Sequence, residues 1–126
     1  MKPTSLNLSL DDRGTTAIEF AILSPVFLGM VIGILGLCLF LFVIGGMHYA
    51  VEEAARCASV RTTVCTDPTS TIAYAQSKYV APGSPTFTYQ PSAACGKSVS
   101  ASLSYTARLG LRQVTIPFSA TACFPG

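Results

Sequence analysis

A long run without charge is the feature that most constrains this chain. From Phe20 to Met47 no residue is charged, over 28 consecutive positions. As a helix this run would measure about 42 Å, and roughly 20 apolar residues already cross a bilayer. A removable signal peptide has a shorter apolar region that ends at a small-residue cleavage motif, and the run fits that pattern poorly. The sequence therefore predicts a transmembrane helix over 15–47.

The cysteines indicate which way this helix points. Lys2 and Arg13 precede it and Arg56 and Arg61 follow it, so the positive-inside rule gives almost a tie. Four of the five cysteines lie after the uncharged run. An even set of cysteines in a small domain indicates disulfides in an oxidising compartment. We therefore expect the N-terminus in the cytoplasm and the C-terminal domain outside it.

The polar segments on either side of the uncharged run differ in pattern. Residues 1–14 form a short leader without hydrophobic periodicity. Residues 48–64 begin with good helix formers, and Glu52 and Arg56 stand four apart in the favourable order. This pattern predicts that the membrane helix continues into water as one long rod.

Residues 65–126 are expected to form a small outer domain rich in strands. The run Thr66-Asp67-Pro68 is typical of a helix start and predicts a short helix over about 68–80. Alternation of apolar and polar residues predicts antiparallel strands over 98–105 and 114–122, with a shorter one over 86–90. Pro117 predicts that the last strand lies at a sheet edge. The expected fold class is thus α+β, anchored in a membrane.

The expected hairpin also suggests how the cysteines pair. With its loop near 107–113, Cys95 and Cys123 lie about equally far from the loop and should meet. If these two residues were directly opposite each other, the residue numbers of all opposite partners would add up to an even number. Aligning the apolar faces of the two strands requires an odd number. A β-bulge near Gly96 is expected to absorb that difference. Cys57 and Cys65 then pair by elimination, and each bond should contribute about 2–4 kcal/mol.

One carboxylate, Glu19, lies at the start of the uncharged helix. Spacing alone favours the simple interpretation that it lies at headgroup level and interacts with the helix dipole. Alternatively, cleavage after Gly14 would give Thr15 a free amine one turn from Glu19. Opposite charges about 4 Å apart attract by roughly 4 kcal/mol at an effective dielectric constant of 20. Glu19 of one helix could then bind the Thr15 amine of a neighbouring helix and fix their register.

The residues around Gly14 resemble a known family. Arg13-Gly14, Ala17-Ile18-Glu19-Phe20-Ala21, Pro25 and the later run 49–56 are together similar to TadE-like proteins, minor pseudopilins of the tight-adherence (Flp) type IVb pilus system. The resemblance covers about residues 13–58, and beyond Cys65 it is only architectural.

This resemblance implies a specific processing step. A prepilin peptidase would cut between Gly14 and Thr15 and recognise Glu19 and Phe20, which would also serve in assembly. The mature subunit would stay in the bacterial inner membrane as a single-pass protein with a periplasmic C-terminal domain. There it would help other pilins or pseudopilins of the same system to assemble a pilus.

Other candidate sites are weaker. Gly29 and Gly33 have the GxxxG spacing of a close helix–helix contact, although glycine is frequent in membrane helices. The net charge is only +2, and without a basic cluster it argues against nucleic acid as a partner. We find no pattern of catalytic residues, no zinc-ligand spacing and no phosphate-binding loop. We therefore predict that the chain is not an enzyme and that it binds no metal, cofactor or small-molecule substrate. The alternative function is an unprocessed single-pass protein whose periplasmic domain binds another envelope component.

Overall fold

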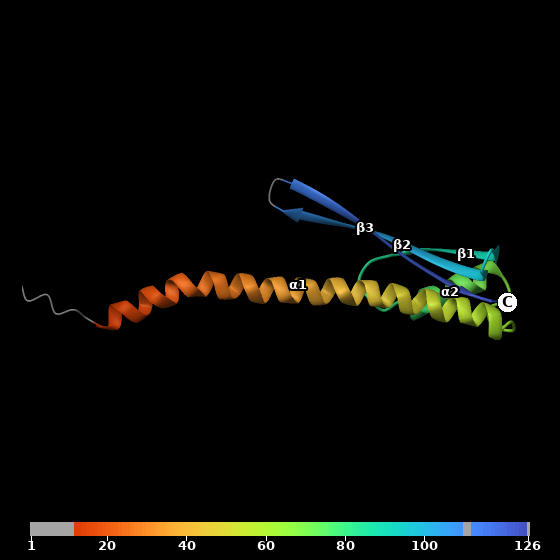
Figure 1. Cartoon of the computed structure of the whole chain (residues 1–126), viewed down its shortest axis with the longest axis horizontal. Helices are drawn as coiled ribbons and strands as arrows, with labels where there is room; N and C mark the ends of the chain where they lie inside the picture. Colours follow the sequence, from red (N-terminus) through yellow and green to blue (C-terminus); the bar gives the residue numbers. More distant parts are fainter. Residues whose placement is uncertain (1–11, 110–111, 126) are drawn as a thin grey trace, which may run out of the picture. The chain divides into compact units, whose positions relative to one another are not determined.

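The computed structural model describes residues 12–109 and 112–125, so most of the expected leader 1–14 lies outside the described residues. The fold is α+β, as predicted, with a long apolar helix, a short helix, an antiparallel sheet and two disulfides (Figure 1). Its elements are α1 (Asp12–Val60), α2 (Pro68–Lys78), β1 (Thr86–Ala93), β2 (Gly96–Leu109) and β3 (Arg112–Phe124).

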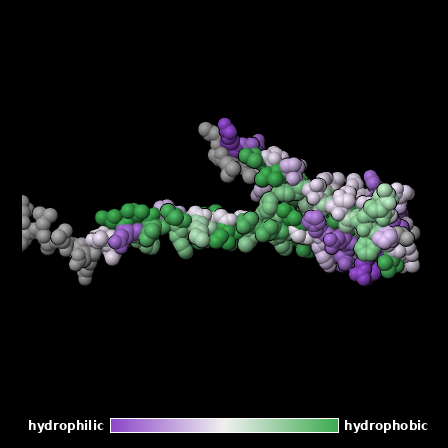
Figure 2. All heavy atoms as spheres, in the orientation of Figure 1, coloured by the Kyte–Doolittle hydropathy of each residue, from purple (hydrophilic) through white to green (hydrophobic). Residues whose placement is uncertain are grey.

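The chain divides into two compact units, 1–38 and 39–126. In the first unit α1 is the described element, and its large apolar side chains are exposed, Phe20 at 73% and Val26 at 70%. Figure 2 shows these hydrophobic residues along the N-terminal part of α1. Among the described residues α1 is the one helix long and apolar enough to cross a membrane. An exposed apolar surface of this length fits a helix solvated by lipid.

The second unit has a small hydrophobic core between the end of α1 and the sheet. The helix contributes mostly small side chains that are completely buried, among them Ala50, Ala54 and Ala55. The sheet contributes Phe87 and Val99 to the same core, together with two alanines. Because alanines project little, the backbone of α1 and the sheet can approach each other closely. α1 itself continues beyond the uncharged run without a break as far as Val60.

The sheet has the order β1-β2-β3, and both pairings are antiparallel. Opposite residues in β2 and β3 have an odd sum, as in Val99↔Ala122 and Leu103↔Phe118, which aligns the apolar faces as expected. β3 lies at an edge, in agreement with the prediction from Pro117. The strands are longer than predicted, because the alternating pattern weakens at both ends of each strand while the pairing continues.

Two disulfides fasten the second unit. Cys57 bonds to Cys65 with a Cα–Cα distance of 5.8 Å, and Cys95 bonds to Cys123 with a distance of 6.1 Å. Cys95–Cys123 is the pair expected from the hairpin geometry, and Cys57–Cys65 is the pair expected by elimination.

The expected bulge near Gly96 is wrong for the β2–β3 pair. Its register runs without a shift from Lys97↔Phe124 to Leu109↔Arg112, and the irregularity lies between β1 and β2 instead, between Gln90 and Ala93. Cys95 precedes β2 in a turn, so the ladder does not constrain which residue it faces. The residue opposite Cys123 is Ser98.

Gly96 has a different role in this turn. Its φ of +117° suits glycine, and a Cβ at this position would collide with the carbonyl oxygen of Phe124. Glycine therefore lets the chain leave the turn next to the end of β3, where Cys95 reaches Cys123.

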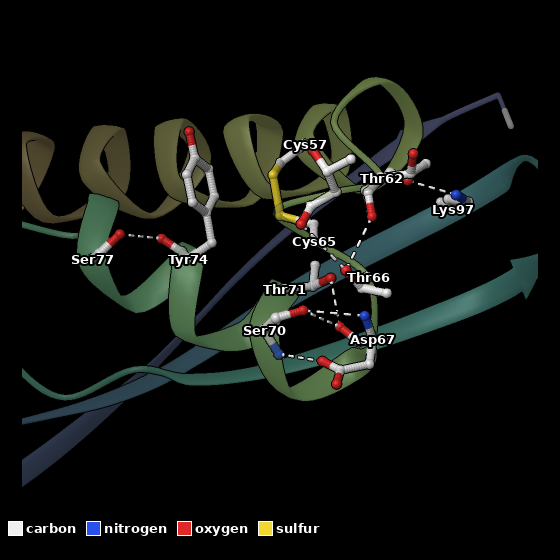
Figure 3. Close-up of a disulfide and its surroundings, with 12 residues drawn as sticks. Cys57, Thr62, Cys65, Thr66, Asp67, Ser70, Thr71, Tyr74, Ser77 and Lys97 are labelled. Carbon is white, nitrogen blue, oxygen red and sulfur yellow. Dashed lines mark hydrogen bonds between the residues drawn. A yellow bond between two sulfur atoms is a disulfide. The ribbon is translucent and has the colours of Figure 1, made fainter.

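The short helix α2 begins with a capping box. The Asp67 carboxylate accepts a hydrogen bond from the Ser70 backbone N–H at 2.7 Å, and Ser70 Oγ accepts one from the Asp67 N–H at 3.1 Å (Figure 3). The bond from the Ser70 backbone, followed by its hydroxyl, lowers the pKa of Asp67. At the other end the Tyr79 hydroxyl donates to the Pro82 carbonyl at 2.8 Å, and partial burial raises the pKa of Tyr79.

Candidate functional site

The candidate processing segment forms the first turns of α1. Gly14, Thr15, Glu19 and Phe20 are all helical and all exposed. The first four N–H groups of a helix have no partner within it, and helix ends fray. The Gly14–Thr15 peptide bond lies in this first turn, since α1 begins at Asp12. A peptidase would therefore have to unwind very little helix to reach this bond.

Thr15 and Glu19 stand four positions apart on α1. Residues at this spacing occupy successive turns on one face of a helix. A Glu19 carboxylate and an amine created at Thr15 would therefore belong to the same face. This face is exposed, so the two groups are accessible to a second helix as well as to each other.

Glycines along α1 fall into two groups. A Cβ added at Gly14, Gly29 or Gly33 would meet no described atom within 4 Å. These glycines are therefore not required by packing within the described chain, and the predicted helix–helix contact of Gly29 and Gly33 stays a prediction. Gly46 is different, because a Cβ there would approach the Ala81 Cβ to 3.2 Å and the Tyr79 ring to 3.6 Å. Sequence reasoning missed Gly46, since the partners that require it are more than thirty positions away.

The C-terminal end of α1 is held by a disulfide and by a hydrogen bond from the sheet. The Cys57–Cys65 disulfide ties it to the loop before α2, where the capping box of Asp67 lies (Figure 3). Lys97 of β2 donates a hydrogen bond from Nζ to the Ala58 carbonyl oxygen at 2.5 Å. A cation at the last carbonyls of a helix is favourable because these groups carry partial negative charge. Lys97 was not singled out from the sequence, because 39 positions separate it from Ala58.

Comparison with known proteins adds an identification for part of the chain. The family model described as TadE-like protein matches residues 14–56. Residues 14–56 are TadE-like. This finding confirms the resemblance inferred from the sequence and associates the chain with the Tad pilus system and its other components. No curated protein and no solved structure matched the chain.

The TadE-like segment coincides with α1 and not with the sheet. It begins at Gly14, includes Glu19 and Phe20, and ends at Arg56, one turn before the end of the helix. It therefore combines an exposed apolar surface, suited to a single-pass membrane protein, with the buried alanines that hold the outer domain. The family likeness is carried by the helix that links membrane and domain, while α2 and the three strands lie beyond the match.

The rest of the described chain offers shallow depressions. One is lined by residues of α1 and α2 that include Glu53, Arg56 and Tyr74, and has a volume of about 170 Å³. His48 borders another, beside Pro117 and Phe118. Within residues 12–109 and 112–125, no group of three His, Cys, Asp or Glu could hold a metal ion.

Proposed function

We propose that this chain is a minor pseudopilin that a prepilin peptidase cuts between Gly14 and Thr15, and that the mature subunit helps to assemble a tight-adherence pilus in the bacterial inner membrane. The observation that carries the proposal is the start of α1. There Gly14 and Glu19 stand at the pilin-like spacing, exposed on the first turns of an apolar helix. The TadE-like match begins at Gly14 itself.

Cleavage would create the charge that assembly needs. Hydrolysis of the Gly14–Thr15 amide consumes one water, leaves a carboxylate on Gly14 and gives Thr15 a free α-amine. Such an amine has a pKa near 8 and is mostly protonated at neutral pH. In this step the chain is the substrate, and the peptidase supplies the catalytic groups.

The new amine would act together with Glu19 of a neighbouring subunit. Apolar contacts between membrane helices give little preference for one axial register, because lipid tails are as apolar as the helix surface. A single ion pair in weakly polar surroundings does define a register. Gly29 and Gly33 are exposed, and a Cβ added at either would meet no described atom within 4 Å, so they would let the helices approach closely.

The proposed orientation places the N-terminus in the cytoplasm and the second unit in the periplasm. Two disulfides in that unit support this assignment, since disulfides persist in oxidising compartments. The peptidase cut would then occur at the cytoplasmic side of the membrane.

Intact-mass measurement of the chain purified from membranes tests the processing step. In cells with an active prepilin peptidase we expect loss of the first 14 residues, and in cells without it the full precursor. The Gly14→Val variant should stay uncut, because a branched side chain precedes the scissile bond. Gly36→Val is the matched control, since a Cβ at Gly36 also meets nothing within 4 Å, and it should be cut normally.

A full-length chain in peptidase-competent cells would contradict the proposal. It would favour the alternative of an unprocessed single-pass protein whose periplasmic domain binds another envelope component. Under that alternative Gly14→Val and Gly36→Val would behave alike.

A further inference from the structure

Strand β3 is an open edge of the sheet in the second unit. It pairs with β2 along its whole length, and no strand of the described chain lies on its other side. At the opposite side of the sheet, α2 packs against β1. The outward N–H and C=O groups of a strand edge can pair with a further strand. β3 therefore offers an edge to which a strand can be added.

The sequence of β3 has few of the features that protect an edge. Natural edge strands often carry charged residues, prolines or bulges that prevent pairing with other chains. After Arg112 no residue of β3 is charged, and its register with β2 contains no bulge. Its one proline, Pro117, belongs where the missing N–H would face solvent. By alternation the N–H groups of Ser119 and Thr121 point to the same open side, where they can bond to another strand.

A groove runs along this open edge, between β3 and the end of α1. Two depressions of about 270 and 380 Å³ succeed each other along it. The first lies between residues 44–48 of α1 and 117–120 of β3, and the second between 52–56 and 121–124. β3 therefore runs in the same direction as this part of α1 (Figure 1). We call the two depressions together the β3 groove, and both of its walls belong to the second unit.

The helix wall of the β3 groove contains a regular stripe of side chains. Its members stand four positions apart and are Ile44, His48, Glu52 and Arg56. Residues at this spacing lie on successive turns of one helix face. Four helical residues advance about 6 Å, and two strand residues advance about 6.7 Å. Alternate side chains of a strand added to β3 would therefore meet successive members of the stripe.

The β3 groove changes from apolar to charged along its length. Ile44 and Phe118 line the first depression. Exposed Glu52, half-buried Glu53 and exposed Arg56 line the second. Among the described residues none of these three charged groups has an ion-pair partner. Because two carboxylates lie beside one guanidinium, this end of the groove has a net negative charge that favours a basic side chain.

We propose that the β3 groove binds an extended segment of a partner protein, which adds to β3 as a fourth strand. Bonds between the two backbones supply affinity, and alternate side chains that face α1 supply specificity. The segment has an apolar side chain toward Ile44. About four positions along, which is two steps of the stripe, it has a lysine or arginine toward Glu52 and Glu53. The inference depends neither on cleavage at Gly14 nor on where the second unit lies relative to the membrane.

Fluorescence anisotropy of labelled peptides, titrated with the full chain in detergent, tests this inference. The probe is a threonine-rich peptide with one valine and, four positions later, one lysine. A matched peptide has glutamate in place of the lysine. We expect the lysine peptide to bind roughly fivefold more tightly at low salt, because ion pairs at partly exposed sites are favourable but weak. Replacing the valine by threonine should also weaken binding.

N-methylation of the peptide separates strand addition from a purely electrostatic contact. A strand bonds to one neighbouring strand through the N–H groups of every second residue. Methylation of one alternate set of peptide nitrogens should therefore weaken binding by more than about tenfold. Methylation of the other set should change it by less than about twofold, because those groups face away from β3. Equal effects of the two sets would show that no strand is added and would overturn the proposal.

Charge reversal in the β3 groove provides the matching test within the chain. Glu52→Lys combined with Glu53→Lys should reverse the preference, so that the glutamate peptide binds more tightly. Lys78→Glu reverses a charge on α2, outside the groove, and should leave the preference unchanged. Non-reducing mass mapping of both disulfides verifies that each variant is folded.

Two further outcomes would overturn the inference. Equal binding of the lysine and glutamate peptides, or no binding of either, would show that the β3 groove does not select such a segment. A bound fraction that falls as the chain concentration rises would show that a second copy of the chain occupies the groove instead.

Discussion

The apolar residues of the two units differ in what surrounds them. In residues 14–38 the large side chains of α1 face outward, and no described part of the protein covers most of them. In the second unit the helix switches to alanines, which are buried to completion against a sheet. The first surface needs a lipid solvent and tolerates any apolar residue, whereas the second depends on shape. One continuous helix can therefore have a lipid-exposed surface in its first part and a closely packed surface in its second part.

Glu19 is a charged residue at the start of the apolar surface of the first unit. Of the substitutions considered, its replacement should have the largest effect, and the effect should be on pilus assembly. An ion pair of roughly 4 kcal/mol corresponds to about three powers of ten in an association equilibrium. Glu19→Gln, which keeps the size and removes the charge, should leave cleavage nearly normal but strongly reduce piliation. Counting pili by electron microscopy, with intact mass to verify cleavage, checks this.

A matched control is Ser24→Ala, which removes a polar group from the same helix without removing charge. It should leave piliation close to that of the unmodified chain. Normal piliation with Glu19→Gln would show that Glu19 plays no part in register.

The second unit should respond most to loss of its longer disulfide loop. Cys95 and Cys123 are 28 positions apart, so replacing both by serine should lower the free energy of unfolding by about 3.5 kcal/mol on the loop-entropy estimate. Cys57 and Cys65 are 8 apart, and their loss should cost about 2.5 kcal/mol. Urea unfolding in detergent, followed by tyrosine fluorescence, measures both.

Cys38→Ser provides the control for this pair of variants, because Cys38 is free and exposed. It should leave the urea midpoint unchanged. A similar midpoint for all three variants would mean that the disulfides do not stabilise the second unit.

The lipid-exposed part of α1 should tolerate a substitution of alanine by leucine that the part packed on the sheet does not tolerate. Ala54→Leu adds volume where the exposed fraction is 0%, and it should destabilise the second unit by about 1–3 kcal/mol. Ala21→Leu adds the same volume on the exposed surface of α1 and should change stability little. Thermal unfolding of the two variants side by side measures the difference. Equal stability would remove the distinction between the two surfaces.

Local patterns predicted most of this fold. The run from Phe20 to Met47, the cap at Asp67 and the alternation over 98–105 each depend on neighbours in sequence, and each gave the correct element. The start of the candidate site could also be found, because Gly14 and Glu19 lie within two turns of one helix. These features need no knowledge of the distant chain.

Contacts over long sequence distances were harder to foresee. Cys95 belongs to a turn and not to the β2–β3 ladder, so the expected bulge at Gly96 is wrong. Lys97 reaches Ala58, and Phe118 reaches Phe40, through the packing of the sheet on the helix. No local pattern indicates such pairs, since each half is unremarkable without the other.

The smallest expected effect concerns the pH response of the second unit. Hydrogen bonds from Ser70 lower the pKa of Asp67 from its usual value of 3.8. A carboxylate whose pKa is lower in the folded state stabilises the fold above the unfolded pKa, and this contribution is lost as the pH falls through the folded pKa. The urea midpoint should therefore decline slightly below pH 3.8 in the unmodified chain. Asp67→Asn retains an acceptor for the Ser70 N–H but does not titrate, so its midpoint should lack this decline. A decline that persists unchanged in Asp67→Asn would show that the capping carboxylate is not its source.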